Sequence, residues 1–440
     1  YEFYGPQKSA EGLDSNFYFG TGSNIYQRIR NGFAGNAASN GGLWKAQKNN
    51  WGPRVGFAAD LTGDGRTSLR GGYGIYYGRI INSTVYNALI NTGNPAGQAQ
   101  VSLAATNALA PIFPNVLTSA PAGTGAIQYF SPKFGSPMIH QADVIFERQI
   151  MKNTSVSASY LLSLGRQLPA FVDRNLSAPT TTQSWAVTGG PYDGQTVSLP
   201  VFATTRPNTS FAQLTEISSV VSSEYHAMVL QFNRRFSGGL QFNINYTLSK
   251  AVDNNQQSVT FTANNTFLNS FDPRADKGRS NYDRRNKFVA NMVYAPRVKG
   301  TAAIRALADG WSIAPVFQYY TGLPYTGVVS GSNGGAGSLN RSGGENRFPG
   351  LARNTFTGPN VWNLDLRISR RFHWKEKLAF EVLGEAFNIA NRTQITGINS
   401  TMYNLISGAL QYNTNFGTIT EAGGTLYRER QIQIGFRVQF

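Results

Sequence analysis

Residue types that commonly carry out catalysis are few in this sequence, and their spacing suggests no reaction. The chain of 440 residues contains three histidines, His140, His226 and His373, and no cysteine. No pair of histidines has the close spacing that would place two imidazoles on one metal ion, and nothing in the sequence supports a serine–histidine–aspartate triad. The absence of thiols excludes disulfides, thiolate metal sites and a cysteine nucleophile. We therefore predict no enzyme activity and no cofactor, and we assign the histidines to interfacial or loop positions.

One segment, DLTGDGRT, is faintly similar to a calcium-binding loop through Asp60, Asp64 and Gly65. The later bidentate acidic residue that such a loop requires is missing. Asp-Gly between two runs of alternating polarity is instead a standard hairpin signal. The segment therefore predicts a turn.

Cationic residues outnumber acidic ones, with 39 Lys and Arg against 23 Asp and Glu and a net charge of +16. They are dispersed as singles and pairs, without a basic arm, a zinc-finger spacing or a recognition-helix pattern, so we do not expect a nucleic-acid partner. One group in or beside a single long loop could make charge-assisted contacts to anionic solutes or lipopolysaccharide phosphates. It consists of Arg274, Lys277, Arg279, Arg284 and Arg285. Plain solvation of a surface loop is the alternative for these charges.

The overall composition indicates a surface that does not face water everywhere. Charged residues make up 14% of the chain and aromatic residues 12%, and glycine occurs 47 times. Soluble domains average about 25% charged residues. No stretch approaches the roughly 18 consecutive apolar residues of a transmembrane helix, so a helical membrane protein is excluded.

Strict alternation of apolar and polar residues is the dominant pattern. From Leu240 to Ser249 every second residue is apolar, and the residues between are Gln, Asn, Thr or Ser. Trp362 to Arg371, Ser155 to Leu164 and the last ten residues repeat the pattern. A period of two predicts β-strands with one apolar and one polar face. Asp365, Arg367, Glu381 and Glu385 lie opposite the apolar stripes, which requires a polar lumen.

Eleven such strands are predicted, and a stub at Tyr1–Tyr4 would make twelve. They cover 54–60, 68–77, 141–150, 154–164, 225–236, 240–251, 287–295, 311–320, 362–372, 378–390 and 429–440. Short turns alternate with long segments rich in Asn, Gly, Ser and Pro, at 78–139, 165–224, 252–285, 321–361 and 391–429. This asymmetry is typical of a transmembrane antiparallel β-barrel of the bacterial outer membrane, with short periplasmic turns and long extracellular loops. Pro315 inside a predicted strand suggests a local bulge.

Aromatic residues recur near the predicted strand ends. Phe236 and Phe372 each follow an Arg pair before a short turn, which suits a girdle at the periplasmic interface. Tyr73, Tyr76, Tyr77, Tyr319 and Tyr320 lie at the loop-bearing ends and suit an outer girdle. The alternative is that these are ordinary strand aromatics in a soluble core.

Six segments in order resemble one family. They are NNWGPRVGFAADLTGDGRTSLRGGYGIYYGR, EYHAMVLQFNRRFSGGLQFNINYTLSKAVD, SNYDRRNKFVANMVYAP, DGWSIAPVFQYYTGLPYT, NLDLRISRRFHWKEKLAFEVLGEAFNIANRT and RERQIQIGFRVQF. Together they resemble the C-terminal barrel of Oar-like TonB-dependent receptors, large outer-membrane proteins abundant in acidobacteria. The resemblance implies that residues 1–440 form about 12 strands of a 22-stranded barrel. It also implies that a plug, a TonB-contacting segment and a carboxypeptidase-regulatory-like domain belong to an N-terminal part not present here.

The resemblance also implies a function and partners. Such a receptor captures a scarce solute in its outer loops and takes it up when TonB acts on the missing N-terminal part. Its surroundings are outer-membrane lipid and lipopolysaccharide. The barrel assembly machinery would recognise the last strand through Ile434, Phe436, Val438 and Phe440. The same four side chains could simply cover lipid and help the last strand pair with the first.

Two other functions are compatible with the alternating pattern. A passive outer-membrane porin or adhesin would show the same alternation without TonB coupling. A soluble, secreted β-propeller or lectin should show self-similar repeats of about 40 to 50 residues, and no such period is present.

Overall fold

The computed structural model of the chain consists mostly of antiparallel β-strands, which confirms the predicted all-β class. The structure describes residues 1–6, 8, 10, 12, 14–91, 100–101, 103–118, 121, 125–255, 267–374, 378–424 and 428–440. Within these ranges no helix has the length and apolar character needed to cross a membrane.

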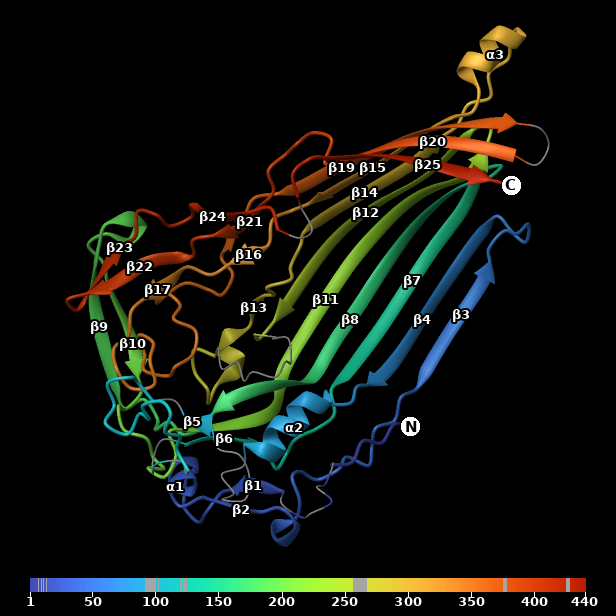
Figure 1. The fold of residues 1–440 in the computed structure, drawn as a ribbon. Coiled ribbons are helices and arrows are strands. Elements are labelled where there is room, and N and C mark those ends of the chain that lie inside the picture. The colour runs from blue at the N-terminus through green and yellow to red at the C-terminus, as the bar shows by residue number, and fades with distance from the viewer. Residues whose placement is uncertain are drawn as a thin grey trace.

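Eleven long strands form one curved sheet in which each strand pairs with the next long strand of the chain (Figure 1). They are β3 (Arg54–Asp60), β4 (Thr67–Tyr77), β7 (Met138–Met151), β8 (Thr154–Asp173), β11 (Gln213–Ser237), β12 (Leu240–Asp253), β14 (Asn286–Tyr294), β15 (Trp311–Tyr320), β19 (Val361–Trp374), β20 (Leu378–Phe387) and β25 (Gln431–Gln439). All eleven predicted strands are present, but β8 runs nine residues and β11 twelve residues further than predicted, into the segment 165–224 expected to be a loop. In the described part of the chain the sheet stays open, with β3 and β25 as its two edges.

The predicted twelfth strand at Tyr1–Tyr4 is wrong. The amide of Glu2 donates to the carbonyl of Asn50 at 3.0 Å, the Tyr1 ring lies 5.1 Å from the Trp51 ring, and no ladder forms. A strand needs a row of paired backbone groups, and this segment has one such hydrogen bond to the chain just before β3.

The sheet has a turn end and a loop end, as predicted. At the turn end Gly238 and Gly239 connect β11 to β12 with φ values of 62° and 79°, a left-handed conformation that suits the two-residue hairpin. The DLTGDGRT segment forms the turn between β3 and β4, where Asp60 Oδ2 accepts a hydrogen bond from the Gly65 amide at 2.7 Å. The connection from β14 to β15 holds a short helix, α3 (Ala302–Ala308), that the sequence interpretation missed. The C-terminus also lies at the turn end (Figure 1).

The strand register places all the apolar stripes on one face. Residues directly opposite each other in antiparallel strands share a face. One row runs from β7 to β19 through Phe146, Ala158, Leu230, Tyr246, Phe288, Tyr319 and Trp362. The neighbouring row on the other face runs through Glu147, Ser157, Gln231, Asn245, Val289, Gln318 and Asn363. We call these the apolar face and the polar face.

Pro315 does not create the predicted bulge. The pairing of β15 with β19 runs without a shift through Pro315 and Leu366. Toward β14, Asn291 pairs with Val316 and Tyr294 with Ile313, so the register is the same on both sides of the proline and only the intervening pairs are lost. Proline has no backbone N–H, and at Pro315 the ladder between β14 and β15 is interrupted without an inserted residue.

The long loops contain regular structure of their own. β8 and β11 continue past the other strands and support a first loop unit with β1 (Ser15–Tyr18), α1 (Ile25–Arg30), β2 (Phe33–Asn36), α2 (Asn82–Ile90), β5 (Gln100–Val101) and β6 (Gly125–Phe130). A second loop unit is a five-stranded sheet in the order β10 (Thr196–Val201), β9 (Thr181–Thr188), β23 (Ala409–Tyr412), β22 (Thr401–Ile406) and β17 (Val328–Ser330). Short pairs complete the loop end: β13 (Gly278–Arg279) beside β12, β16 (Pro324–Tyr325) with β18 (Phe356–Thr357), and β21 (Ile395–Ile398) with β24 (Ile419–Ala422).

Candidate functional site: the loop units and the polar face

The polar face carries an ion-pair network across its last three strands. Glu381 of β20 lies within 3.3 Å of Arg367, 3.5 Å of Arg371 and 3.7 Å of Arg437. Glu385, four residues further along β20 and on the same face, lies 3.7 Å from Arg367. These contacts follow from the register, because Arg371 and Arg437 lie directly opposite Glu381, and Arg367 opposite Glu385. The network confirms that these charges share the face opposite the apolar stripes.

The same face carries further charges near its other edge and amides along its middle strands. Arg70 of β4 and Glu147 of β7 form an ion pair at 2.6 Å. Asn243 donates to Asn233, and Ser157 donates to Gln231 at 3.2 Å. Charged and amide groups in this density keep their solvation only beside water, so the face is suited to line an aqueous passage.

The second loop unit gathers three separate loops around one core. Tyr403 comes from the loop between β20 and β25, and its ring stacks on Phe348 of the β15–β19 loop with centroids 4.6 Å apart. The Tyr403 hydroxyl donates to the carbonyl of Gly189, in the β8–β11 loop, at 3.2 Å. Trp185 of that same loop is 1% exposed. The three loops therefore form one folded body.

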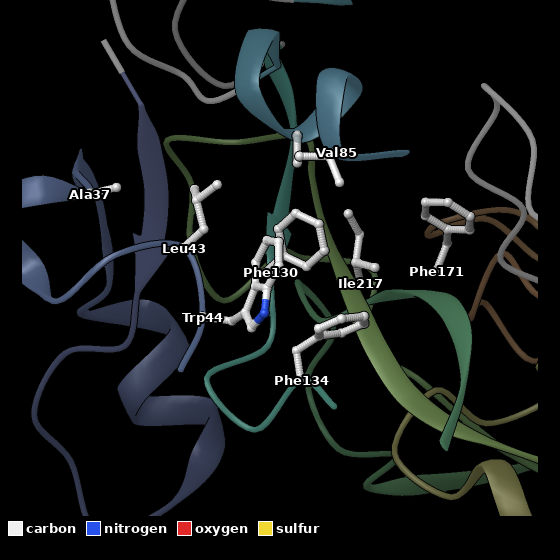
Figure 2. Close-up of a cluster of buried hydrophobic side chains, with 9 residues drawn as sticks. Ala37, Leu43, Trp44, Val85, Phe130, Phe134, Phe171 and Ile217 are labelled. Carbon is white, nitrogen blue, oxygen red and sulfur yellow. The ribbon is translucent and has the colours of Figure 1, made fainter. Parts of the chain in front are cut away.

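The first loop unit has its own aromatic core (Figure 2). Phe130 at the end of β6 packs against Trp44 with ring centroids 4.3 Å apart, and Phe134 lies 5.1 Å from Phe130. Figure 2 shows Val85 of α2 pointing toward Phe130 from above. Ile217 of β11 completes the contact, which fixes α2 and the N-terminal segment on the extension of the main sheet.

Buried ion pairs tie a fourth loop to the second unit. Arg353 forms an ion pair with Asp253 at the end of β12, and both side chains are inaccessible to water. Arg347 lies 2.9 Å from Asp276 and 3.7 Å from Glu345. Burial raises the pKa of the Asp276 and Glu345 carboxyls, and the Arg347 guanidinium opposes that rise. A buried ion pair adds little net stability, because both charges lose their hydration. An arrangement of the loops that separated the two partners would leave each charge buried and uncompensated, which is costly, so the pairs favour the arrangement observed.

Four of the five predicted anion-binding residues contact other groups of the protein. Lys277 contacts Glu224 at 3.2 Å, and Arg279 contacts Asp283 at 3.1 Å. Arg284 donates to the carbonyl of Thr321 at 3.2 Å and lies over the Tyr320 ring. Arg285 donates to the carbonyl of Ser249 at 3.4 Å, while Arg274 is exposed. Most of these cations have protein partners, which favours a structural role; anion binding stays a prediction.

The aromatic residues predicted to form interfacial girdles separate by face. Tyr73 lies opposite Val55, Tyr77 opposite Met138, and Tyr319 belongs to the apolar row. Neighbouring residues of a strand point to opposite faces, so Tyr320 lies on the polar face. There its hydroxyl donates to Gln318 at 3.2 Å. A lipid-facing role does not fit its placement, and the same holds for Tyr76, which adjoins Tyr77 in the strand.

At the turn end the two predicted phenylalanines are exposed. Phe372 lies on the apolar face opposite Phe380, and the Arg370 guanidinium stacks 4.7 Å from the Phe372 centroid. Phe236 lies within a register shift, between Arg234 and Ser237, near the end of β11. The arrangement combines aromatic rings with a cation at one depth, as a girdle requires; whether it contacts lipid headgroups stays a prediction.

Two histidines occupy equivalent places near the loop end of the apolar face. His140 Nδ1 lies 2.7 Å from the Tyr73 hydroxyl, and His226 Nδ1 lies 2.7 Å from the Tyr160 hydroxyl. His373 lies in β19. Among the described residues no three His, Asp or Glu side chains come together as metal ligands.

The last strand presents its apolar residues without cover. Ile434 is 72% exposed and Phe436 77% exposed, and Val438 and Phe440 are exposed as well. Val438 lies opposite Phe380, so the series continues the apolar face to the open edge. Recognition by the assembly machinery is a separate prediction that this geometry leaves open.

Sequence reasoning missed the buried ion pairs and the shared core of the loops. Arg347 and Arg353 lie in a glycine-rich loop, whereas Asp276 comes from the loop after β12 and Asp253 is the last residue of β12. The available signal was the combination of isolated charges with Phe348 in a segment otherwise made of small polar residues.

Comparison with known families agrees with this geometry. Residues 1–433 match the outer membrane beta barrel domain family. No curated protein sequence matches the chain.

Solved structures with a similar arrangement include three outer-membrane proteins. The outer membrane transporter YddB from Escherichia coli has 11% identity and a TM-score of 0.47 over 88% of this chain and 40% of its own. A mutant of the ferric enterobactin receptor PfeA from Pseudomonas aeruginosa has 11% identity and a TM-score of 0.46 over 89% and 40%. The siderophore receptor PirA from Acinetobacter baumannii has 9% identity and a TM-score of 0.44 over 90% and 41%. The chain thus spans about two fifths of their length, and we infer nothing about function from likenesses this distant.

Proposed function

The chain belongs to the outer membrane beta barrel domain family, and from that premise we propose that it forms part of the barrel of an Oar-like TonB-dependent receptor. In this proposal the protein captures a scarce solute at the loop end and takes it up with TonB-coupled energy. The 440 residues supply the C-terminal part of the barrel, and the plug and TonB-contacting segment belong to the N-terminal part. Its place is the outer membrane, with the apolar face toward lipid.

The observation that carries the proposal is the common fold of the long loops. Loops from β8–β11, β15–β19 and β20–β25 share one sheet and one core, with Trp185, Phe348 and Tyr403 at its centre. Flexible loops lose conformational entropy when they become ordered around a ligand, whereas loops that are already ordered avoid this cost of binding. A body of this kind at the outer end of the barrel suits the capture of a dilute solute.

A passive porin or adhesin is the second candidate. The ion-pair network around Glu381 would line a permanently open channel equally well. Such a pore needs only a lining and a constriction, and it has no use for a separately folded body built from several loops.

An epistasis experiment distinguishes the two candidates. A strain lacking this protein is grown on panels of limiting nutrients until one nutrient shows a growth defect, and TonB is then removed in both backgrounds. A TonB-coupled receptor predicts that loss of TonB reproduces the defect on that nutrient and that the double deletion is no worse. If the defects add, or if uptake of that nutrient persists without TonB, the protein is a passive pore.

A further inference from the structure

A lysine and a histidine follow the apolar residues at the loop end of the apolar face. The apolar series of β12 ends at Leu248, and Lys250 is the next residue on the same face, because alternate residues of a strand share a face. His226 of β11 lies directly opposite Lys250. Residues placed in this way have Cβ atoms about 4.5 to 5.5 Å apart. The two side chains therefore form one polar site beside the apolar series.

The position of Lys250 along β12 gives the depth of this site. Lys250 lies ten residues from Leu240, the first residue of the strand. Ten residues correspond to about 33 Å along the strand, and a tilt of about 40° leaves roughly 25 Å along the membrane normal. The apolar band of an outer-membrane barrel is about 25 Å tall. Lys250 and His226 therefore lie where the apolar band ends, at the depth of lipid headgroups.

Both side chains can donate hydrogen bonds to a ligand. Lys250 is exposed, and no carboxylate among the described residues pairs with it. His226 is partly exposed, and its Nδ1 lies 2.7 Å from the Tyr160 hydroxyl. When that hydroxyl donates to Nδ1, the neutral imidazole carries its proton on Nε2. The pair then offers an ammonium group and an imidazole N–H to an anion.

The charges beside this pair are mostly positive. Glu224 lies two residues from His226 on the same face of β11. It is the shared partner of Arg166, at 3.7 Å, and of Lys277, at 3.2 Å. With Lys250 these residues make three cations against one acid, a net charge of +2. An anion at this depth therefore meets a positive potential.

The next row of the same face toward the turn end is apolar and accessible. It contains Tyr160, Met228 and Leu248, which lie opposite one another in the strand register. They are 48%, 42% and 38% exposed. The face therefore offers an apolar surface for acyl chains and a cationic site for phosphate at neighbouring depths.

We propose that Lys250 and His226 bind a phosphate group of lipopolysaccharide, the phosphorylated glycolipid of the outer leaflet. The loop end of an outer-membrane barrel lies outside, so this is the lipid that meets the site. The Lys250 ammonium and the His226 Nε2–H donate to phosphate oxygens, while the acyl chains lie on Met228 and Leu248. All four side chains belong to the apolar face, so the lipid reaches them from the membrane without entering the polar face. The site requires only this orientation of the sheet and is independent of TonB coupling.

Binding of purified lipopolysaccharide to the whole protein tests the site. The protein is purified from outer membranes, freed of its own lipopolysaccharide in detergent, and titrated with intact or dephosphorylated lipopolysaccharide, and native mass spectrometry gives the occupied fraction. Lys250→Gln changes an exposed side chain, so the fold should be retained, as circular dichroism can verify. Arg148→Gln is the matched control, since Arg148 is exposed on the same face at the turn end, opposite Thr67 and Val156.

Lys250→Gln should lower the affinity for intact lipopolysaccharide about fivefold, the effect of one cation at an anionic lipid surface. His226→Phe keeps a ring but loses the donor, and it should lower the affinity about threefold. Arg148→Gln should bind as the wild type does, and dephosphorylated lipopolysaccharide should bind Lys250→Gln and the wild type equally. Equal losses for Lys250→Gln and Arg148→Gln, or a loss that persists with the dephosphorylated lipid, would overturn the phosphate site. Wild-type affinity in either site variant would also overturn it.

Discussion

An arginine in the middle of the apolar face tests the orientation of the sheet. Ile244 lies four residues from Leu240, the first residue of β12. It is opposite Phe232 on one side and Ala290 on the other. It also borders a small groove of about 260 Å³ whose lining includes Phe242, Met292 and Pro315. Ile244→Arg therefore places a guanidinium among apolar groups, far from either end of the strand.

The depth of Ile244 in the membrane determines how much free energy of folding the arginine should cost. Four residues correspond to about 13 Å along the strand, and a tilt of about 40° leaves roughly 10 Å along the membrane normal. The apolar band of such barrels is about 25 Å tall, so Ile244 lies close to its middle. An arginine there costs about 2 to 4 kcal/mol, which lowers the folding equilibrium constant by more than tenfold.

Asn243→Arg is the matched control, one residue away on the polar face. It removes the amide contacts of Asn243 with Asn233 and Asn245, and the loss of each hydrogen bond costs about 0.5 to 1.5 kcal/mol. Gln241→Arg, at an exposed position of the same face, removes no such contact and should be nearly neutral. The assay is denaturant-dependent folding into phospholipid vesicles, followed by tryptophan fluorescence. Equal losses for Ile244→Arg and Gln241→Arg would refute the assignment of the apolar face to lipid.

Three further predictions concern the loops and the last residue. Trp185→Ala should destabilise the second loop unit by about 3 to 5 kcal/mol; trypsin should then cleave the long loops in intact cells while the barrel stays inserted, and cleavage at the wild-type rate would refute a shared core. Because the folded state raises the pKa of Asp276 and Glu345, it binds protons more tightly than the unfolded loops. The loops held by these ion pairs should therefore lose stability as pH rises from the ordinary carboxyl pKa through the raised values. The rate of proteolysis of the loops should increase across that pH range, and Glu345→Gln should make the increase smaller. The same increase in the variant would contradict the raised pKa of Glu345. Deleting Phe440 should lower the amount of protein in the outer membrane without changing its synthesis, as measured by fractionation and immunoblotting. Normal amounts of the deletion variant in the outer membrane would show that Phe440 only covers lipid.

The long strands could be predicted because their signal is local. Alternation from Leu240 to Ser249 or from Trp362 to Arg371 needs no knowledge of the partner strand, since each strand has one face in lipid and one in a polar space. The stub at Tyr1–Tyr4 failed for the opposite reason. It contains strand-forming residues, but a strand also requires a neighbour, and its backbone makes a single hydrogen bond beside β3.

The bulge expected at Pro315 did not form, because the ladder tolerates a local gap. The register of β14 with β15 is the same on both sides of the proline. α3 could have been predicted, since Thr301 is a good cap and the following residues, Ala-Ala-Ile-Arg-Ala-Leu-Ala, favour a helix.

The loop units could not be predicted from local patterns. β9 pairs with β23 through Val187 and Leu410, which are more than two hundred residues apart in the chain. The buried pair of Arg353 with Asp253 likewise joins a residue of the β15–β19 loop to the last residue of β12, one hundred residues away in the chain. Segments rich in Gly, Ser and Asn carry weak strand signals, and only the long-range contacts select their structure.

Spin-label accessibility along β12 tests whether the apolar face of the sheet lies in lipid. Single cysteines from Gln241 to Leu248 are labelled with a nitroxide in the protein reconstituted in vesicles. Collision rates with oxygen, which concentrates in lipid, and with a water-soluble nickel chelate are then compared. With the apolar face in lipid, the profile has a period of two, with the oxygen maxima at Phe242, Ile244, Tyr246 and Leu248 and the nickel maxima at the residues between them. A profile without that period, or one with oxygen maxima at the residues between, would show that this face is not in lipid.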